Sequence, residues 1–189
     1  MQGGKQAFRA EVVAQRARRT PAERAEASRR IAERAATLPV LTAARTVALY
    51  APLASEVDVL LLLERLTARA VFPRARREGR VMTFACCAPG ELVAGPLRVL
   101  EPPPDAPEVA LEAVEVVVVP GLAFSLDGHR LGRGGGYYDA TLCAMPHAVR
   151  LGVSYEGEVF PSLPFEPHDA PLDVLVTEAR VLHFQRESR

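Results

Sequence analysis

Residues 116–142 read VVVVPGLAFSLDGHRLGRGGGYYDATL, and this stretch decides the fold that the sequence predicts. Its four consecutive valines are β-branched and apolar, which is typical of a strand that is buried on both faces of a parallel sheet. Pro120 and Gly121 end this strand. After a loop, three consecutive glycines lead into a helix that we expect over residues 137–144. The stretch therefore predicts a strand, a glycine-rich turn and a helix.

This turn has the composition of a phosphate-binding loop. Glycines let backbone N–H groups approach a phosphate closely, and the start of a helix adds further unpaired N–H groups. Arg130 and Arg133 supply permanent charge and forked donors, and Asp139 stands where a carboxylate can share a magnesium ion with phosphates. A flexible surface turn remains the alternative for the glycines alone. Neither the P-loop motif nor the GxGxxG dinucleotide motif occurs.

Composition limits the classes of protein. The chain has 189 residues, of which 49% are hydrophobic and 24% charged, with a formal net charge of zero. We expect one domain over residues 1–189. The zero net charge argues against broad electrostatic attraction to nucleic acid or membrane, so we expect neither as a partner, and any anion site must be local. Three cysteines and four scattered histidines form no disulfide framework or zinc motif. These features indicate a cytoplasmic enzyme, and we expect a monomer.

Strands and helices are predicted to alternate along the chain. Helical spacing and a Thr-Pro-Ala-Glu start predict two helices over residues 5–18 and 20–36. Strands are expected at residues 45–50, 70–73, 81–85, 148–154 and 174–178, with a further helix after residue 58. The sequence thus predicts an α/β fold, a three-layer α/β/α sandwich with a mostly parallel sheet. Its layering would be Rossmann-like without the dinucleotide fingerprint.

Several side chains outside the glycine turn are candidates for binding. Lys5 and Arg9 share one helix face, where a solvated basic face is the alternative. Tyr50 and Glu56 follow the first strand at the end where open parallel sheets bind ligands, although Glu56 could also cap a helix. Met82 and Phe84 are two residues apart in an expected strand, so their side chains share one face. That face could receive a flat ring, although core packing is the commoner use of such a pair.

The motif RLGRGGGYYD, preceded by VPGLAF and followed by EPHDAPLD and TE, resembles the signature of the 5-formyltetrahydrofolate cyclo-ligase family. The resemblance implies an ATP- and magnesium-dependent enzyme that cyclises 5-formyltetrahydrofolate to 5,10-methenyltetrahydrofolate. ADP and phosphate would be released after phosphorylation of the formyl oxygen. No nucleophilic side chain is needed, because positioning and charge neutralisation carry phosphoryl transfer.

The resemblance and the patterns above together assign roles to individual residues. Arg130 and Arg133 are expected to be catalytic. The residues expected to bind ATP are Lys5, Arg9, Arg130, Gly132, Arg133, Gly134, Gly135, Gly136, Tyr137 and Tyr138. Those expected to bind the reduced folate are Tyr50, Glu56, Met82, Phe84, Tyr137 and Tyr138. Asp139 and, by resemblance, Asp173 are the expected magnesium ligands.

Three positions depart from the family pattern. The family often has an aromatic residue followed by glycine or asparagine where Leu97 and Arg98 stand, and glutamine where Glu158 stands. These changes leave open a non-catalytic nucleotide- or folate-binding homologue that keeps the fold. The adjacent His168 and Asp169 could suggest a catalytic pair, but neighbours in sequence seldom form one, so a structural role is favoured.

Overall fold

The computed structural model describes residues 2–76, 78–167 and 169–185. Four α-helices lie within these ranges: α1 (Gln2–Ala17), α2 (Pro21–Ala36), α3 (Pro39–Thr42) and α4 (Tyr137–Cys143). The start of α2 is fixed by the predicted capping box, in which the Thr20 hydroxyl accepts from Glu23 N–H while the Glu23 carboxylate accepts from Thr20 N–H. Both N-terminal helices predicted from the sequence are confirmed.

A central eight-stranded sheet has the order β13-β12-β10-β7-β1-β2-β3-β6. Its strands are β1 (Thr46–Ala48), β2 (Arg69–Arg74), β3 (Thr83–Ala85), β6 (Glu108–Val109), β7 (Val116–Val119), β10 (Val149–Val153), β12 (Val174–Val176) and β13 (Val181–His183). Neighbours from β12 through β10, β7 and β1 to β2 pair in parallel, whereas β13, β3 and β6 join antiparallel at the edges. The predicted mostly parallel sheet is confirmed.

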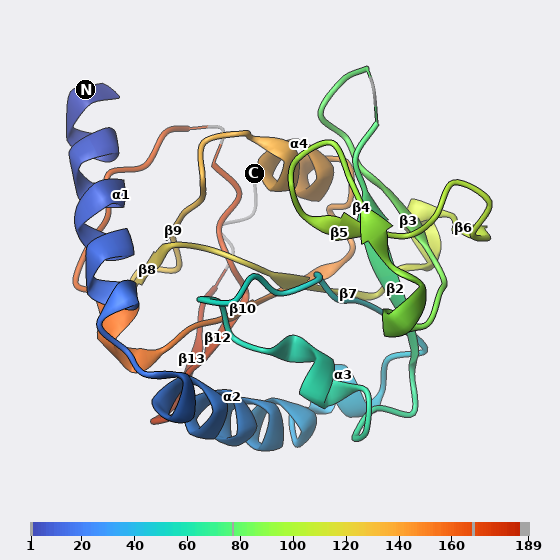
Figure 1. Cartoon of the computed structure of the whole chain (residues 1–189), viewed down its shortest axis with the longest axis horizontal. Helices are drawn as coiled ribbons and strands as arrows, with labels where there is room; N and C mark the ends of the chain where they lie inside the picture. Colours follow the sequence, from blue (N-terminus) through green and yellow to red (C-terminus); the bar gives the residue numbers. More distant parts are fainter. Residues whose placement is uncertain (1, 77, 168, 186–189) are drawn as a thin grey trace.

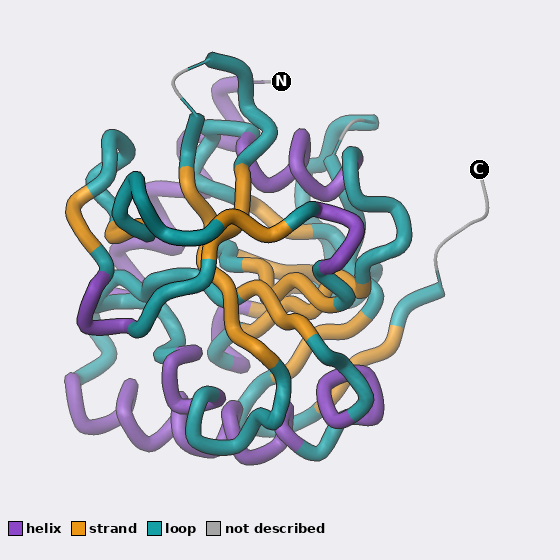
Figure 2. The backbone as a smooth tube through the Cα atoms, turned by 90° about the vertical axis from the view of Figure 1, so that its right-hand side faces the viewer, coloured by secondary structure: helices purple, strands orange, loops and turns teal. Residues whose placement is uncertain are grey.

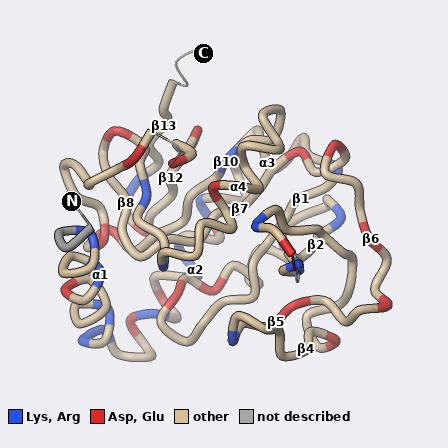
Figure 3. The backbone as a smooth tube through the Cα atoms, turned by 90° about the horizontal axis from the view of Figure 1, so that it is seen from above, with Lys and Arg blue, Asp and Glu red and all other residues tan. Residues whose placement is uncertain are grey.

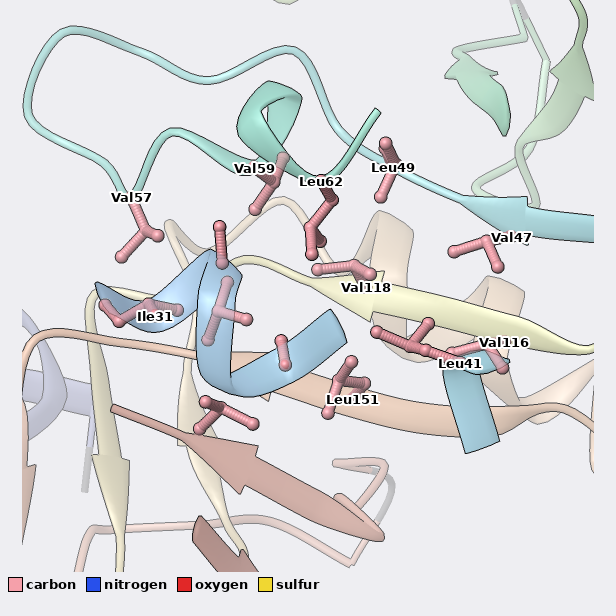
Figure 4. Packing of buried hydrophobic residues seen from close by; sticks show 14 of the residues in the cluster. Ile31, Leu41, Val47, Leu49, Val57, Val59, Leu62, Val116, Val118 and Leu151 are labelled. Atoms are coloured by element: carbon pink, nitrogen blue, oxygen red, sulfur yellow. The ribbon is translucent and has the colours of Figure 1, made fainter. Parts of the chain in front are cut away.

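Helices cover both faces of this sheet, with α2 and α3 below it and α4 above it in Figure 1. The tube view in Figure 2 shows the strands as the middle layer. On one face, Val116 and Val118 belong to the same core cluster as Ile31 of α2 and Leu41 of α3, which Figure 4 shows. On the other face, Val117 and Val119 pack with α4 residues. All four valines are buried because alternate side chains point into the two cores.

A smaller sheet, not predicted from the sequence, lies beside α1. It has the order β11-β8-β9, from β8 (Ala123–Ser125), β9 (Arg130–Leu131) and β11 (Val159–Phe160). Val12 of α1 is fully buried against Leu122, Leu131 and Leu163, and the rings of Phe8 and Phe160 meet edge to face. The glycine turn that follows β9 is therefore held beside α1.

The segment after residue 58 is a correction to the predicted secondary structure. It forms only a 3-10 turn, η1 (Val59–Leu62), followed by irregular turns. The Asp58 side chain accepts from Leu60 N–H, while Val59 and Leu62 are buried against α2. An unbroken leucine run has no period, so it does not distinguish a helix from a compact buried turn.

Other short elements complete the chain. A two-stranded hairpin is formed by β4 (Val93–Ala94) and β5 (Leu100–Glu101), and further 3-10 turns are η2 (Pro89–Glu91), η3 (Leu111–Ala113) and η4 (Glu156–Glu158). Acidic and basic residues are interspersed along the chain in Figure 3. Among the described residues, no helix combines the length and apolarity that a membrane crossing requires.

Candidate active site

A cavity of about 780 Å³ lies beyond the carboxyl ends of the central strands. Tyr50, two residues after β1, and Pro120, directly after β7, both line it. Because β1 and β7 are parallel neighbours, their carboxyl ends meet at this edge, which is where open α/β sheets bind ligands. Its volume falls in the range of about 300–1,000 Å³ that is typical of small-molecule sites.

The glycine turn forms one wall of the cavity, which residues 132–136 line without a gap. Gly134 and Gly136 have φ values of +96° and +71°, which belong to the left-handed region that favours glycine. The helix that follows, α4, has only seven residues. The anion-binding capacity of this wall therefore comes from the loop and the nearby cations rather than from a helix dipole.

Helix α1 brings two cations to the same cavity. Lys5 Nζ donates to Asp169 Oδ2 at 3.2 Å and lies 3.6 Å from Glu166 Oε2. Arg9 Nε donates to the carbonyl of Gly132 at 3.0 Å, so α1 is bonded directly to the glycine turn. The structure thus brings Lys5 and Arg9 to the cavity that the glycine turn lines, although they are more than 120 residues away from that turn in sequence.

Arg130 and Asp139 form a partly buried ion pair in the cavity wall next to the glycine turn. Arg130 Nη2 lies 2.7 Å from Asp139 Oδ1, and their side chains are 3% and 19% exposed. The same Asp139 oxygen accepts from the Ala170 N–H at 3.1 Å. Arg130 Nε has no hydrogen-bond partner within the described chain. A buried guanidinium with an unsatisfied donor is suited to bind an anion that enters the cavity.

Arg133 and Glu56 connect the glycine turn to the loop after β1. Arg133 Nη2 lies 3.1 Å from Glu56 Oε1, with side chains that are 53% and 9% exposed. Glu56 Oε2 also accepts from Leu53 N–H at 3.0 Å. Glu56 therefore lines the cavity instead of capping a helix, because the segment that follows it forms only the short turn η1.

A less polar wall faces the cavity from the other elements. Tyr50, Met82, Tyr137 and Tyr138 all line it. The pKa values of Tyr50 and Tyr138 are raised mainly by burial and, to a smaller extent, by the nearby negative charge of Glu56. Both phenols therefore stay protonated around neutral pH, and Tyr50 donates to the Val57 carbonyl at 2.9 Å. This wall offers aromatic and thioether surface to a ring-shaped ligand.

Two residues that the sequence assigns to the site lie outside the cavity. Phe84 is fully buried in the core between the sheet and α4 and does not line the cavity, because its position in β3 turns it inward. Asp173 does not line the cavity either. It directly precedes β12, where its Oδ2 accepts from the Arg150 N–H at 2.7 Å and so ties β12 to β10.

Sequence reasoning missed a carboxylate that the structure does bring to the cavity. Asp169 lines it together with Asp139, and Ala170 N–H, next along the chain, donates to Asp139. The signal was present, because Asp169 belongs to the same EPHDAPLD stretch as Asp173. His168, weighed with Asp169 as a catalytic pair, lies outside the described residues.

The positions that depart from the family pattern have separate surroundings. Leu97 lines the cavity from the turn between β4 and β5, next to Arg98, which has a φ of +59°. Glu158 is outside the cavity and buried, with its Oε2 2.5 Å from Arg16 Nη2. Arg16 also donates to the carbonyl of Gly121. Arg16 therefore fastens α1 both to η4, through Glu158, and to the loop that follows β7, through Gly121.

Comparison with known proteins gives consistent results. A model of the 5-formyltetrahydrofolate cyclo-ligase family matches residues 1–178. A 5-formyltetrahydrofolate cyclo-ligase of Mycolicibacterium smegmatis is 36% identical over 145 residues, which cover 72% of this chain and 75% of that protein. The Escherichia coli K12 protein of the same name is 32% identical over 170 residues, covering 86% and 93%.

A solved structure is also similar. The structure of Aquifex aeolicus 5,10-methenyltetrahydrofolate synthetase superposes with a TM-score of 0.84 at 32% identity, covering 98% of this chain and 95% of that one. The similarity extends over nearly the whole length of both chains, so it includes the glycine turn, α1 and the C-terminal segment that together surround the cavity.

Proposed function

The chain belongs to the 5-formyltetrahydrofolate cyclo-ligase family, and we propose that it uses ATP to cyclise 5-formyltetrahydrofolate to 5,10-methenyltetrahydrofolate. One observation carries the proposal. A single cavity combines a glycine turn flanked by cations, two carboxylates and an aromatic wall. These are the groups needed to hold a nucleotide, a divalent cation and a flat heterocycle next to one another.

The phosphate end would be formed by the glycine turn and its cations. Lys5, Arg9, Arg130 and Arg133 would bind phosphate oxygens together with backbone N–H groups of residues 132–136. Each of these side chains now has a protein partner at 3.2 Å or less. ATP phosphates would therefore compete with these carboxylates and this carbonyl, while Arg130 Nε, which has no partner within the described chain, could bind a phosphate oxygen directly.

The folate end would lie against Tyr50, Met82 and the paired tyrosines. The Glu56 carboxylate, which is 9% exposed and faces the cavity, would accept hydrogen bonds from the N–H groups of the pterin ring. The apolar bodies of Met82 and Tyr138 would cover the ring faces. Phe84 has no part in this proposal.

Magnesium fits the carboxylates at the phosphate end. Asp139 and Asp169 offer hard oxygen ligands within one cavity, and Mg²⁺ in phosphoryl-transfer sites binds through one or two carboxylates plus substrate phosphates. Within the described chain, no cluster of three or more His, Cys, Asp or Glu side chains forms a complete metal cage. A site that needs the nucleotide for completion suits Mg²⁺, which would neutralise phosphate charge during transfer.

The reaction would proceed without a covalent enzyme intermediate. The formyl oxygen attacks the γ-phosphorus of ATP, the bond to the β-phosphate oxygen breaks, and ADP leaves. Nitrogen 10 then attacks the formyl carbon and loses its proton, and the carbon–oxygen bond breaks to release phosphate. None of the described residues that line the cavity is serine, cysteine or histidine, which is consistent with catalysis by positioning and charge stabilisation.

The decisive experiment is a direct assay. Purified protein is mixed with 5-formyltetrahydrofolate, ATP and Mg²⁺, and formation of the methenyl product is followed by its absorbance. Product should form only when all three are present, with one ADP released per methenyl group. If no ATP-dependent product forms while calorimetry still detects ATP or folate binding, the chain is a non-catalytic binding homologue and the proposal fails.

A further inference from the structure

Five basic side chains line the cavity, and one of them, Arg80, had no role in the sequence-based prediction. The other four each have a partner: Asp169 for Lys5, the Gly132 carbonyl for Arg9, Asp139 for Arg130 and Glu56 for Arg133. Arg80 is exposed and makes no hydrogen bond or ion pair with the part of the chain that the structure describes. Arg80 could therefore bind a ligand without first losing a contact with a described protein group.

The Arg80 guanidinium lies directly against the glycine turn. A Cβ atom added at Gly136 would stand 3.0 Å from Arg80 Nη1 and 3.9 Å from its Cζ. The Arg9 guanidinium lies against Gly134 of the same turn, where an added Cβ would stand 3.7 Å from its Cζ. Glycine at both positions thus leaves room for two guanidinium groups to approach the backbone that would cradle the phosphates.

A buried hydrogen-bond chain fixes the loop that carries Arg80. Met82, two residues later, donates its N–H to Thr141 Oγ1 at 2.9 Å. The Thr141 hydroxyl donates in turn to the Tyr137 carbonyl at 2.7 Å. Thr141 is 1% exposed, so solvent does not compete for these bonds. These bonds therefore hold Met82, at the end of the β2–β3 loop, in a fixed position relative to Tyr137, the residue after the glycine turn.

We propose that Arg80 is a further phosphate-binding residue, which contacts the nucleotide phosphates from the β2–β3 loop. The inference rests on the proposed function, because it requires that ATP occupies this cavity. A guanidinium donates forked, charge-assisted hydrogen bonds to phosphate oxygens. Arg80 reaches the same backbone as Arg9, but from a different part of the fold.

Arg80 differs from most of the other cavity cations because no carboxylate of the described residues is paired with it. The cavity is lined by five basic residues and five acidic ones, Glu56, Glu101, Asp139, Glu166 and Asp169, so its formal charges cancel. Lys5, Arg130 and Arg133 already donate to carboxylates, so a phosphate must compete with those carboxylates for the charge of each cation. Arg80 can bind without breaking an ion pair, so its attraction for the nucleotide is not offset by a lost contact.

The test compares Arg80→Ala with Arg76→Ala, a matched control. Arg76 is an exposed arginine of the same loop that does not line the cavity, so its removal changes the loop's charge equally. We expect Arg80→Ala to raise the KM for ATP and the Kd for ATP by about fivefold or more, the range of a charge-assisted hydrogen bond reduced for exposure. The KM for the folate and the melting temperature should stay unchanged.

A second variant and a truncated ligand isolate the phosphate contact. Arg80→Lys should restore part of the affinity, and Arg80→Ala should not change the Kd for adenosine, which lacks phosphates. If Arg80→Ala leaves the ATP constants unchanged while wild-type protein forms product, or if Arg76→Ala weakens ATP equally, Arg80 is not a phosphate ligand. If wild-type protein forms no product, the proposed reaction fails, and the calorimetric Kd values still decide the role of Arg80.

Discussion

Arg133 Nη2 lies 3.1 Å from Glu56 Oε1, so an expected ATP ligand and an expected folate ligand are paired with each other in the ligand-free cavity. Neither residue can contact its substrate fully while the pair persists. A folate ring that draws Glu56 away would release Arg133 for a phosphate, and ATP would release Glu56 in the same way. Because binding free energies are reciprocal, each substrate should strengthen the binding of the other.

Glu56→Gln should therefore tighten ATP binding and weaken folate binding. The neutral amide no longer competes with phosphate for Arg133, and a partly exposed ion pair is worth up to about 1 kcal/mol, so the Kd for ATP should fall about two- to fivefold. Calorimetric titration with ATP and Mg²⁺ in the absence of folate measures this change.

The control for this substitution is Glu101→Gln. Glu101 lines the same cavity, but its carboxylate accepts from Ala75 N–H and pairs with none of the cavity's cations within the described residues. Glu101→Gln removes the same charge without releasing an arginine. Equal tightening of ATP binding in both variants would mean that general electrostatics, and not the Arg133–Glu56 pair, sets the affinity.

Asp169→Asn should weaken magnesium binding, whereas Asp173→Asn should lower stability. Asp169 lines the cavity beside Asp139, so its loss should raise the Mg²⁺ concentration for half-maximal activity by about tenfold or more. Asp173→Asn should leave that concentration unchanged and lower the melting temperature, because Asp173 ties β12 to β10. Magnesium titrations of activity and thermal melts measure both effects. The reverse pattern would restore Asp173 as the ligand.

Removal of the charge of Arg16 should make the stability of the protein depend on pH through Glu158. Burial raises the pKa of Glu158 above its ordinary value of 4.5, and the adjacent Arg16 guanidinium opposes that rise. Arg16→Met removes the opposing charge, so the pKa should rise further and stability should be lost as pH increases through it. We expect a loss of about 3 kcal/mol at pH 8 and clearly less at pH 5.5.

Urea unfolding at the two pH values measures this difference. The double variant Arg16→Met, Glu158→Leu serves as the control, because it removes both buried charges and should lose the pH dependence. A loss of stability in Arg16→Met that is the same at both pH values would show that Glu158 stays ionised without its partner.

Much of the fold could be predicted because local sequence patterns agree with the environment of the central elements. The valines of β7 are buried on both faces, and their composition alone indicates this. Thr20 and Glu23 likewise form the capping box that their spacing predicts. By contrast, β8, β9 and β11 contain two or three residues each, and they are defined by pairing between distant segments rather than by local pattern.

Residues that belong to a compact sequence motif could be assigned to the site from the sequence. Residues in irregular segments could not, because the backbone conformation there determines which side chains face the cavity. The cations near the glycine turn follow from the motif and its family. Asp169 and Asp173 are four residues apart in a segment without regular structure, so the sequence could not tell which one faces the cavity. Arg80 was not predicted because nothing in a charged turn indicates that one arginine lies on Gly136.

Arg98 is the last residue for which the structure predicts a measurable effect. It lies in the turn between β4 and β5 with a φ of +59°, and it is the one non-glycine residue with positive φ among those described. The left-handed conformation costs an ordinary residue about 1 kcal/mol, whereas glycine and asparagine adopt it readily. These are the residues that the family resemblance leads one to expect at this position.

Arg98→Gly should therefore stabilise the protein by about 0.5 kcal/mol, since relief of the backbone strain exceeds the added freedom of the unfolded chain. Arg98→Asn should stabilise at least as much, because asparagine keeps a Cβ and restricts the unfolded state more than glycine does. Urea unfolding should show a higher midpoint with an unchanged slope. Leu97→Gly, one position earlier and without positive φ, is the control and should lower the midpoint. A lower midpoint for Arg98→Gly would mean that contacts of the arginine side chain outweigh its backbone strain.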